Sequence, residues 1–412
     1  MQSKIVSHSH AVSKQKTIPF AIYILTLGIF SMVTSEFQVS GMVPIMAYDL
    51  GVSISQIGYL VSLYALSMTF GGPLLAIGLL KTPPKKALTA LYVIFIAAEV
   101  LGALANSYST LAIARVITGA VSGAFFGVAL AICVELVSTE QRGWAVSIVL
   151  SGIMVGTILG LPMANLIGTY AGWRESFWTT GVLATIAGLI SLFFLPTIPK
   201  PPIMSLRSEL SHLKNLKLWS VFATSLLIIG ATFAAFTYFT PILKEVSGYS
   251  EGMIACLLIL YGSATIVGNA IVGKLSERYT IITLTIGLIL LTLFLLLFGL
   301  FAAQKSLAAL SLVGIGLVGV TMNPAMVTRV MKTANGRSLV NTVHSSMITL
   351  GVVIGSFLGG FAMNLGWGLR APLWIGVCMA LLGLMTLLPD IRALYRENRK
   401  KRSYLWNDNS GY

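Results

Sequence analysis

Charged residues are scarce in this sequence, and their scarcity excludes most classes of protein. Only 10% of the 412 residues are Asp, Glu, Lys or Arg, whereas 56% are hydrophobic. Ordinary soluble domains are about 25% charged. A soluble fold of this length would leave too much apolar surface in water. The composition, with 40 glycines that suit closely packed helices, therefore predicts an all-α integral membrane protein.

Cysteines and acidic residues are also few. The three cysteines lie inside apolar segments, so the sequence offers no extracellular disulfide framework. The 13 acidic residues are outnumbered by 27 basic ones, which gives a net charge of +14. Such a balance can indicate nucleic-acid binding, but in membrane proteins basic residues collect in the cytoplasmic loops. We therefore expect no nucleic-acid partner.

Motifs of energy-coupled and catalytic proteins are missing as well. The sequence has no nucleotide-binding Gly-x4-Gly-Lys-Ser/Thr run, so ATP-driven transport would need another chain. We find no convincing cluster of metal ligands and no catalytic triad. The protein is therefore not expected to be an enzyme or to carry a cofactor or metal.

What the sequence does contain is a series of apolar runs. About 20 residues cross a hydrocarbon core of ~30 Å. Twelve runs reach this length, at residues 18–46, 56–79, 87–106, 109–133, 143–168, 175–195, 217–241, 251–273, 281–302, 306–328, 338–365 and 368–389.

The distribution of basic residues predicts the orientation of these spans. If both termini are cytoplasmic, the outer loops hold four basic residues: Arg174, Lys244, Lys305 and Arg370. Arg115 lies within a span, which leaves 22 of the 27 basic residues on the inner side. The positive-inside rule therefore predicts cytoplasmic termini in the cell (inner or plasma) membrane.

The predicted domains follow from the spans and the polar segments between them. We expect an N-terminal tail at 1–17, a six-helix bundle at 18–195, a linker at 196–216, a second six-helix bundle at 217–389 and a basic tail at 390–412. The protein is expected to work as a monomer in the lipid bilayer.

The two predicted bundles are related by an internal repeat. At an offset of 197 residues, Pro44 matches Pro241 and Tyr64 matches Tyr261. Twin runs of glycines at four-residue spacing, Gly152, Gly156 and Gly160 in the first bundle and Gly351, Gly355 and Gly359 in the second, also correspond. Two pseudo-symmetric halves with a substrate site between them are typical of secondary transporters. The glycine faces either pack tightly against a neighbouring helix or let the halves slide.

Several local patterns point to a particular family. They are Thr34-Ser-Glu36-Phe, Leu111-Ala-Ile-Ala-Arg115-Val-Ile-Thr-Gly119, Thr139-Glu-Gln-Arg142-Gly-Trp-Ala145 and Gly156-Thr-Ile-Leu-Gly160-Leu-Pro162. Together they resemble the twelve-span drug:proton antiporter branch of the major facilitator superfamily. Within that branch the sequence is most similar to chloramphenicol, arabinose and purine efflux proteins.

The resemblance implies the fold of that superfamily and a set of gating residues. The candidates are Gly152, Gly156, Gly160, Pro162, Arg142, Gly273, Glu277 and Arg278. The pattern is incomplete, because Leu80 stands where the family's loop between spans two and three usually has an aspartate.

Only three ionisable residues other than histidine fall deep inside spans, namely Glu36, Glu99 and Arg115. At 1.5 Å per residue they lie about 12, 10 and 9 Å from the outer ends of spans one, three and four. An unpaired charge there costs at least ~2.5–3.5 kcal/mol, so each side chain needs a partner or a function.

We assign proton coupling to this group. A carboxylate in a low-dielectric site can exchange a proton near neutral pH as solvent access changes, which suits Glu36. Arg115 would pair with Glu36 when that carboxylate is charged, and bond span-one carbonyls otherwise. The alternative is a permanent Glu36–Arg115 salt bridge. Glu99 either takes part in coupling or forms a structural pair with Arg115.

Aromatic residues on spans one, two and seven are candidates for substrate binding, because the family uses these spans to line its cavity. They are Phe30, Phe37, Tyr64, Phe236 and Tyr238. An aromatic site with little charge suits neutral or amphipathic cargo. His344, near the inner start of span eleven, either packs through a hydrogen bond or contacts substrate.

These features predict a secondary active transporter that exports a small organic molecule, a drug or metabolite, in exchange for protons by alternating access. The alternative is a facilitator or a proton-symporting importer of a sugar, nucleobase or related metabolite.

Overall fold

The computed structural model describes residues 18–79, 81–138, 141–197, 215–334 and 338–409. All regular secondary structure in these ranges is helical. The first six helices are α1 (Phe20–Leu50), α2 (Ile54–Leu79), α3 (Pro84–Ala103), α4 (Tyr108–Glu135), α5 (Arg142–Tyr170) and α6 (Trp173–Phe194). The rest are α8 (Leu216–Phe236), α9 (Phe239–Pro241), α10 (Glu251–Phe301), α11 (Lys305–Val318), α12 (Asn323–Ala334), α13 (Ser338–Ala362) and α14 (Ala371–Asn409), with short π or 3-10 turns at Ile242–Val246, Val320–Met322 and Met363–Trp367.

The predicted spans are present, although two of them form one continuous helix. Eleven helical segments of the described chain are long and apolar enough to cross a membrane. The longest, α10, has 51 residues and a non-helical backbone at Tyr279 (φ −123°, ψ 42°), between the spans predicted at 251–273 and 281–302. This kink divides α10 into two membrane crossings, so the described chain has twelve.

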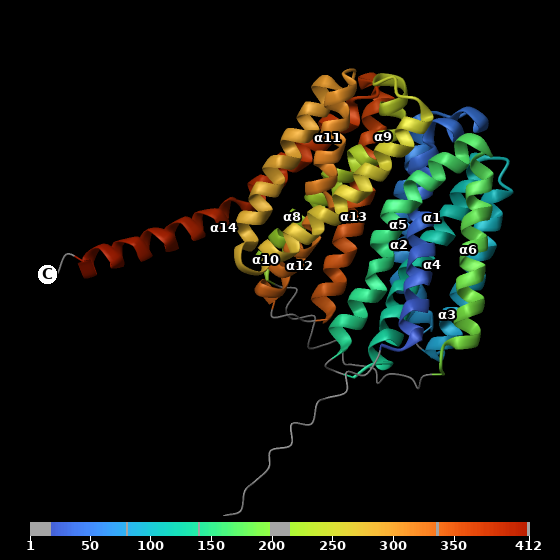
Figure 1. Cartoon of the computed structure of the whole chain (residues 1–412), viewed down its shortest axis with the longest axis horizontal. Coiled ribbons are helices and arrows are strands. Elements are labelled where there is room, and N and C mark those ends of the chain that lie inside the picture. The colour runs from blue at the N-terminus through green and yellow to red at the C-terminus, as the bar shows by residue number, and fades with distance from the viewer. Residues whose placement is uncertain (1–17, 80, 139–140, 198–214, 335–337, 410–412) are drawn as a thin grey trace, which may run out of the picture.

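The helices form two groups that lie side by side in Figure 1, with α1–α6 on one side and α8–α14 on the other. The two groups repeat each other in detail. A methyl group on Gly119 would clash with the backbone oxygen of Tyr64, and one on Gly316 would clash with that of Tyr261. Both residues of the second contact follow those of the first by 197 positions. This correspondence confirms the pseudo-symmetry expected from the sequence.

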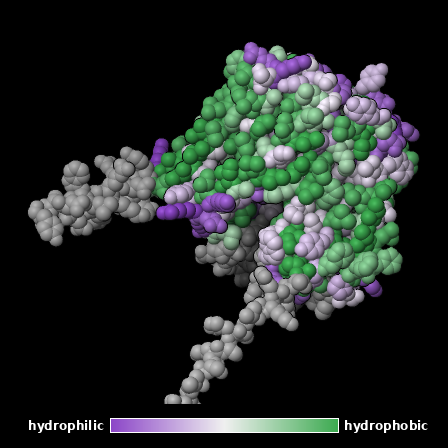
Figure 2. Space-filling view, viewed as in Figure 1, coloured by the Kyte–Doolittle hydropathy of each residue, from purple (hydrophilic) through white to green (hydrophobic). Residues whose placement is uncertain are grey.

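The surface of the molecule is apolar over most of its height. Figure 2 shows hydrophobic residues across the outside of both halves. Large side chains that a soluble protein would bury are exposed, such as Phe70 (58%), Leu293 (55%) and Phe193 (74%). Lipid is the solvent that suits such a surface.

The predicted seventh span, 217–241, is not one continuous helix. Its helix α8 ends at Phe236, and Thr237 and Tyr238 separate it from α9. Pro241 has no N–H for the carbonyl of Thr237, which favours an interruption at this point. Pro44, the repeat partner of Pro241, stays within the continuous helix α1.

The segment after residue 389 also differs from the expected span end. Helix α14 continues through Pro389 to Asn409. In Figure 1 its last turns extend sideways, away from the bundle. The predicted N-terminal tail at 1–17 and most of the linker lie outside the described residues.

Candidate functional site

A buried arginine lies at the centre of the first half. Arg115 of α4 has 0% of its surface exposed. Its Nη1 donates to the backbone oxygen of Ser35 at 2.7 Å, and its Nη2 donates to that of Glu36 at 3.2 Å. The guanidinium also lies 4.2 Å from the centre of the Tyr64 ring. Backbone carbonyls of α1 and one aromatic ring therefore hold this charge in place.

The predicted salt bridge to Arg115 is absent. No carboxylate of the described chain lies within ion-pair distance of Arg115, so neither Glu36 nor Glu99 pairs with it. The arginine instead takes the other arrangement expected from the sequence, in which it bonds carbonyls of the first span. A permanent Glu36–Arg115 bridge and a direct Glu99–Arg115 pair are therefore wrong for this conformation.

Glu99 lies in a sealed polar network that connects α1, α3 and α6. Its side chain is fully buried, and it accepts hydrogen bonds from Ser35 Oγ at 2.5 Å and from Gln38 Nε2 at 3.3 Å. Gln38 in turn accepts a bond from Thr180 at 3.0 Å. Arg115 Nη1 also lies 3.4 Å from Ser35 Oγ, so Ser35 connects the arginine to Glu99. This connection passes through a hydroxyl group rather than through an ion pair.

Glu36 differs from Glu99 because part of its side chain is exposed. The side chain is partly exposed and has no hydrogen-bond partner among the described residues. Its neighbours on α1, residues 31–35 and 37–43, are all buried, so protein surrounds this stretch of helix. The accessible surface of Glu36 must then face an internal space. Of the three groups, Glu36 is the one whose side chain is partly exposed in the structure, whereas Glu99 and Arg115 are fully buried.

Aromatic side chains of the second half face this part of α1. The Phe37 ring stacks on Phe233 at 6.2 Å between ring centres and meets the edge of Phe236 at 5.3 Å. Phe236 also contacts Phe239 and Tyr261. The aromatic cluster (Phe37, Phe233, Phe236, Phe239 and Tyr261) crosses the boundary between the halves. Phe30, which precedes Glu36 by six residues on α1, is partly exposed.

The two halves are joined at the end opposite the chain start. Thr240 donates to the backbone oxygen of Ser40 at 3.0 Å, and the hydroxyl groups of Ser62 and Ser356 lie 2.8 Å apart. Asn364 donates to Tyr59 at 2.8 Å. At the other end, where α1 begins, Figure 2 shows a hollow between the halves. We call this the inner end, following the predicted orientation, and the end where the halves are joined the outer end.

Two aromatic residues predicted to bind substrate have structural positions in this conformation. Tyr64 is 1% exposed, and its hydroxyl donates to Met32 and Ser122, while its ring supports Arg115. Tyr238 is fully buried at the outer contact, where its hydroxyl donates to the backbone oxygen of Ser356 at 2.9 Å. Both side chains are buried in this conformation, as are the predicted substrate-binding residues Phe236 (2% exposed) and Phe37 (7%), so substrate binding by any of the four stays a prediction.

Of the two roles expected for His344, the structure shows packing through a hydrogen bond. It is 2% exposed, its Nε2 lies 2.9 Å from the hydroxyl of Ser225, and its ring stacks on Phe222. The histidine thereby joins α13 to α8 inside the second half.

The predicted gating glycines of α5 lie against α1 of their own half. Methyl groups on Gly152, Gly156 and Gly160 would meet Thr26, Val33 and Thr34, respectively. This is the tight packing that the four-residue spacing allowed, and Pro162 is buried in the same helix. A gating role for this face stays a prediction.

The other predicted gating residues lie near helix ends. Arg142 Nε donates to the backbone oxygen of Val134 at the end of α4, at 3.2 Å. Gly273, Glu277 and Arg278 precede the kink in α10, and both charged side chains are exposed. Their role in gating is likewise a prediction.

Some polar residues of the structure were not expected from the sequence. Arg329 and Asp390 form an ion pair at 2.8 Å, with Arg329 only 5% exposed. Each lies one residue beyond a predicted span end, at 328 and 389, so neither was counted as a charge within the membrane. Ser35 and Gln38 were also missed, because an isolated serine or glutamine gives no signal of its partner.

Twelve crossings in two pseudo-symmetric halves, with charged groups buried inside the first half, are typical of a multi-pass membrane transporter. Residues 25–341 match the model of the Major Facilitator Superfamily. The chain belongs to this superfamily.

Individual relatives agree with that assignment. The chain is 31% identical to the inner membrane transport protein YdhP of Escherichia coli (strain K12), over 91% of this chain and 97% of the relative. It is 30% identical to a chloramphenicol resistance protein of Streptomyces lividans, over 90% and 96%. A solved bacterial homologue of the human lysosomal transporter Spinster, in an inward-facing and occupied conformation, superposes with a TM-score of 0.71 at 15% identity, covering 90% of this chain and 96% of that one. At that identity the likeness shows the fold alone.

Proposed function

We propose that this protein exports a small organic molecule in exchange for protons. The bundles at 18–195 and 217–389, connected by the linker at 196–216, alternate access to a site between them. We place the protein in a bacterial cytoplasmic membrane with both termini inside, working as a monomer. The names of the two relatives, an inner membrane transport protein and a chloramphenicol resistance protein, support the location and the direction of transport.

One observation carries the proton coupling. Arg115 bonds backbone oxygens of α1 although Glu36, which supplies one of those oxygens, is its neighbour. A charged carboxylate beside a buried guanidinium would be expected to pair with it. The observed arrangement is the one expected when Glu36 carries a proton and is neutral.

A transport cycle follows from this arrangement. In the inward-open state the protonated Glu36 releases its proton to the inside, and the carboxylate then attracts Arg115. This shift pulls the guanidinium away from the carbonyls of α1, the helix whose residues contact the second half. Cargo bound against the aromatic cluster then moves outward, and a proton from outside restores the neutral state. Proton and cargo are thereby coupled through α1.

The lining of the site indicates the class of cargo. The second half contributes phenylalanine side chains that pack on Phe37, the residue after Glu36, and that would have to separate from it to admit cargo. Such a surface binds flat or branched apolar groups by contact area, with one or two polar groups on the first half for orientation. We therefore propose neutral or weakly amphipathic molecules as cargo.

The decisive experiment measures proton release from everted membrane vesicles while a panel of drugs and metabolites is added. Wild type is compared with Glu36→Gln, which keeps the shape of the side chain but holds no exchangeable charge. For a transported compound, wild type should dissipate the proton gradient and accumulate the compound. The Glu36→Gln variant should fall to the level of empty vesicles in both measurements.

Glu175→Gln is the matched control, because Glu175 is an exposed glutamate at the outer end of α6. It should transport like wild type. If Glu36→Gln moves cargo as fast as wild type and neither protein consumes the gradient, the protein is a facilitator and Glu36 is structural.

A further inference from the structure

The second half contains a pocket that the transport site does not use. It has a volume of about 500 Å³ and lies at the inner end, between α8, the kink of α10, α12 and α14. Its charged lining consists of Lys217, Arg278, Arg329, Lys332 and Asp390. Four cations thus share one pocket with a single carboxylate.

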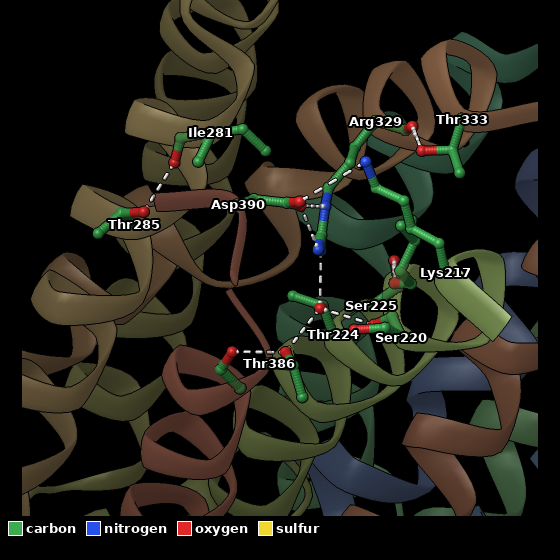
Figure 3. Close-up of polar contacts among 12 residues, drawn as sticks. Lys217, Ser220, Thr224, Ser225, Ile281, Thr285, Arg329, Thr333, Thr386 and Asp390 are labelled. Atoms are coloured by element: carbon green, nitrogen blue, oxygen red, sulfur yellow. Dashed lines mark hydrogen bonds and ion pairs between the residues drawn. The ribbon is translucent and has the colours of Figure 1, made fainter. Parts of the chain in front are cut away.

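The only acid of the lining is already neutralised. Arg329 donates to Asp390 Oδ2 through Nε at 3.0 Å and through Nη2 at 2.8 Å. Its third bond goes from Nη1 to Thr224 at 2.7 Å, and Thr224 bonds Thr386. Figure 3 shows the arginine held between Asp390 and Thr224. The Arg329–Asp390 pair therefore contributes no net charge to the lining of the pocket.

The three remaining cations have no carboxylate of their own within the lining. Lys332 donates to the hydroxyl of Thr280 at 2.8 Å and to the backbone oxygen of Glu277 at 3.1 Å, both neutral acceptors. Lys217 lies 3.9 Å from the already paired Asp390. Arg278 has a ring contact with Tyr279 at 5.3 Å. A surplus of about three positive charges therefore faces the pocket.

Membrane topology alone does not account for this arrangement. The positive-inside rule needs basic residues on the inner side, but it does not require them to meet. Here they come from α8, α10 and α12 and converge on one pocket, at a cost in mutual repulsion. A bound anion would remove that cost, and ammonium and guanidinium groups together are donors that suit the oxygens of a phosphate.

The surroundings of the pocket favour a lipid as the source of the phosphate. Ile282 of α10 (42% exposed) lines the pocket, and Leu216 of α8 (84%) and Met331 of α12 (47%) are sequence neighbours of lining residues. Exposed apolar side chains next to a cationic pocket at the end of membrane helices match a molecule with acyl chains and an anionic headgroup. A free phosphate would gain nothing from them.

We propose that this pocket binds the phosphate of an anionic phospholipid headgroup and so ties α8, α10, α12 and α14 together at the inner end. The site does not depend on the transported cargo or on proton coupling, and binding can be measured without transport.

The test uses the full-length protein in a neutral detergent, with phosphatidylglycerol or phosphatidylcholine added. Native mass spectrometry counts bound lipid, and thermal melting measures stabilisation of the folded state. The variant Lys217→Gln/Lys332→Gln removes two cations and leaves the Arg329–Asp390 pair intact. Each basic residue near an anionic lipid surface changes the affinity about fivefold, so the double variant should bind phosphatidylglycerol roughly 30-fold more weakly.

The matched control is Lys81→Gln/Lys274→Gln. It removes two exposed lysines, one in each half, that do not line the pocket. The proposal predicts wild-type binding of phosphatidylglycerol in this control and little effect of phosphatidylcholine in any protein. Equal binding by all three proteins would overturn the site. Equal stabilisation by inorganic phosphate alone would overturn a lipid as the source.

If the pocket variant melts early without lipid, Lys332→Gln alone is compared by native mass spectrometry. It should bind about fivefold more weakly than wild type, and unchanged binding would again overturn the proposal.

Discussion

The two halves share a fold and differ in where they keep their charges. The first half buries Glu99 and Arg115 in the middle of its helices, whereas the second half has its buried arginine, Arg329, at the inner end. At the repeat offset of 197, the counterpart of Glu36 is Phe233. Duplication has therefore kept the helices and the glycine contacts while one half became polar at its centre and the other aromatic.

The matched tyrosines of the repeat show this difference most clearly. Tyr64 and Tyr261 are both buried, and a glycine of the neighbouring helix packs on the backbone of each. The hydroxyl of Tyr64 is hydrogen-bonded and its ring carries Arg115. The hydroxyl of Tyr261 has no partner among the described residues, and its ring joins the aromatic cluster. The same residue in the same place supports a charge in one half and apolar packing in the other. This difference fits the proposed function, in which the first half binds protons and the second half contacts cargo.

The largest expected effect comes from removing the charge of the first half. We expect Arg115→Leu to reduce proton-coupled transport in everted vesicles to the level of empty vesicles. Arg115→Lys should restore little of it, because one ammonium cannot bond both carbonyls and also stack on Tyr64. Amounts of folded protein in the membrane should be measured by size-exclusion chromatography. Full activity in Arg115→Lys would show that charge alone suffices.

A smaller effect is expected from the aromatic half. Phe233→Leu keeps the apolar surface but removes the ring that stacks on Phe37. A cargo ring that stacks on Phe233 would lose an aromatic pair that contributes about 0.5–1.5 kcal/mol, so the apparent affinity for such cargo should fall by a factor of about 2 to 12. The number of protons released per cargo molecule should stay the same. A change in that ratio would contradict a division of tasks between the halves.

The smallest effect concerns the two tyrosines. Tyr64→Phe leaves Ser122 and the backbone of Met32 without the tyrosine hydroxyl, and should destabilise the protein by about 1–2 kcal/mol. Tyr261→Phe removes a hydroxyl that has no partner, so it should be neutral or slightly stabilising. Melting temperatures of both variants, measured in one detergent, make the comparison. Equal melting would mean that the two sites are alike.

The fold could be predicted from the sequence because each crossing needs a long apolar run, and the runs are separated by polar residues. The repeat could be recognised because few other residues fit at positions where helices pack closely, so that both halves have kept glycine or proline there. Two departures from straight helices could not be predicted from the sequence. The spans at 251–273 and 281–302 form one helix with a kink at Tyr279, and the break at Tyr238 lies inside an apolar run that gives no sign of it.

The site was predicted only in part. Glu36, Glu99 and Arg115 could be found because charges inside apolar runs are rare. Their partners could not, because the rotation of each helix about its axis decides which side chains meet. Ser35 therefore bonds Glu99 while the adjacent Glu36 faces an internal space, a difference that follows from one residue step of about 100° around α1. Arg329 and Asp390 were missed because the predicted spans end at 328 and 389, whereas the helical spans continue to Thr333 and Leu394.

The outer contact between the halves has a consequence for how the transporter responds to its surroundings. In the described part of the chain this contact consists of neutral hydrogen bonds and ring contacts, such as Thr240 on Ser40 and Tyr59 on Phe357. The outer ion pairs Arg174–Asp49 and Lys244–Glu251 each stay within one half. Dissolved ions screen charges but hardly weaken neutral bonds. The outer contact should therefore open about equally readily in fresh water and in brine, so that transport by this protein would depend little on external salinity.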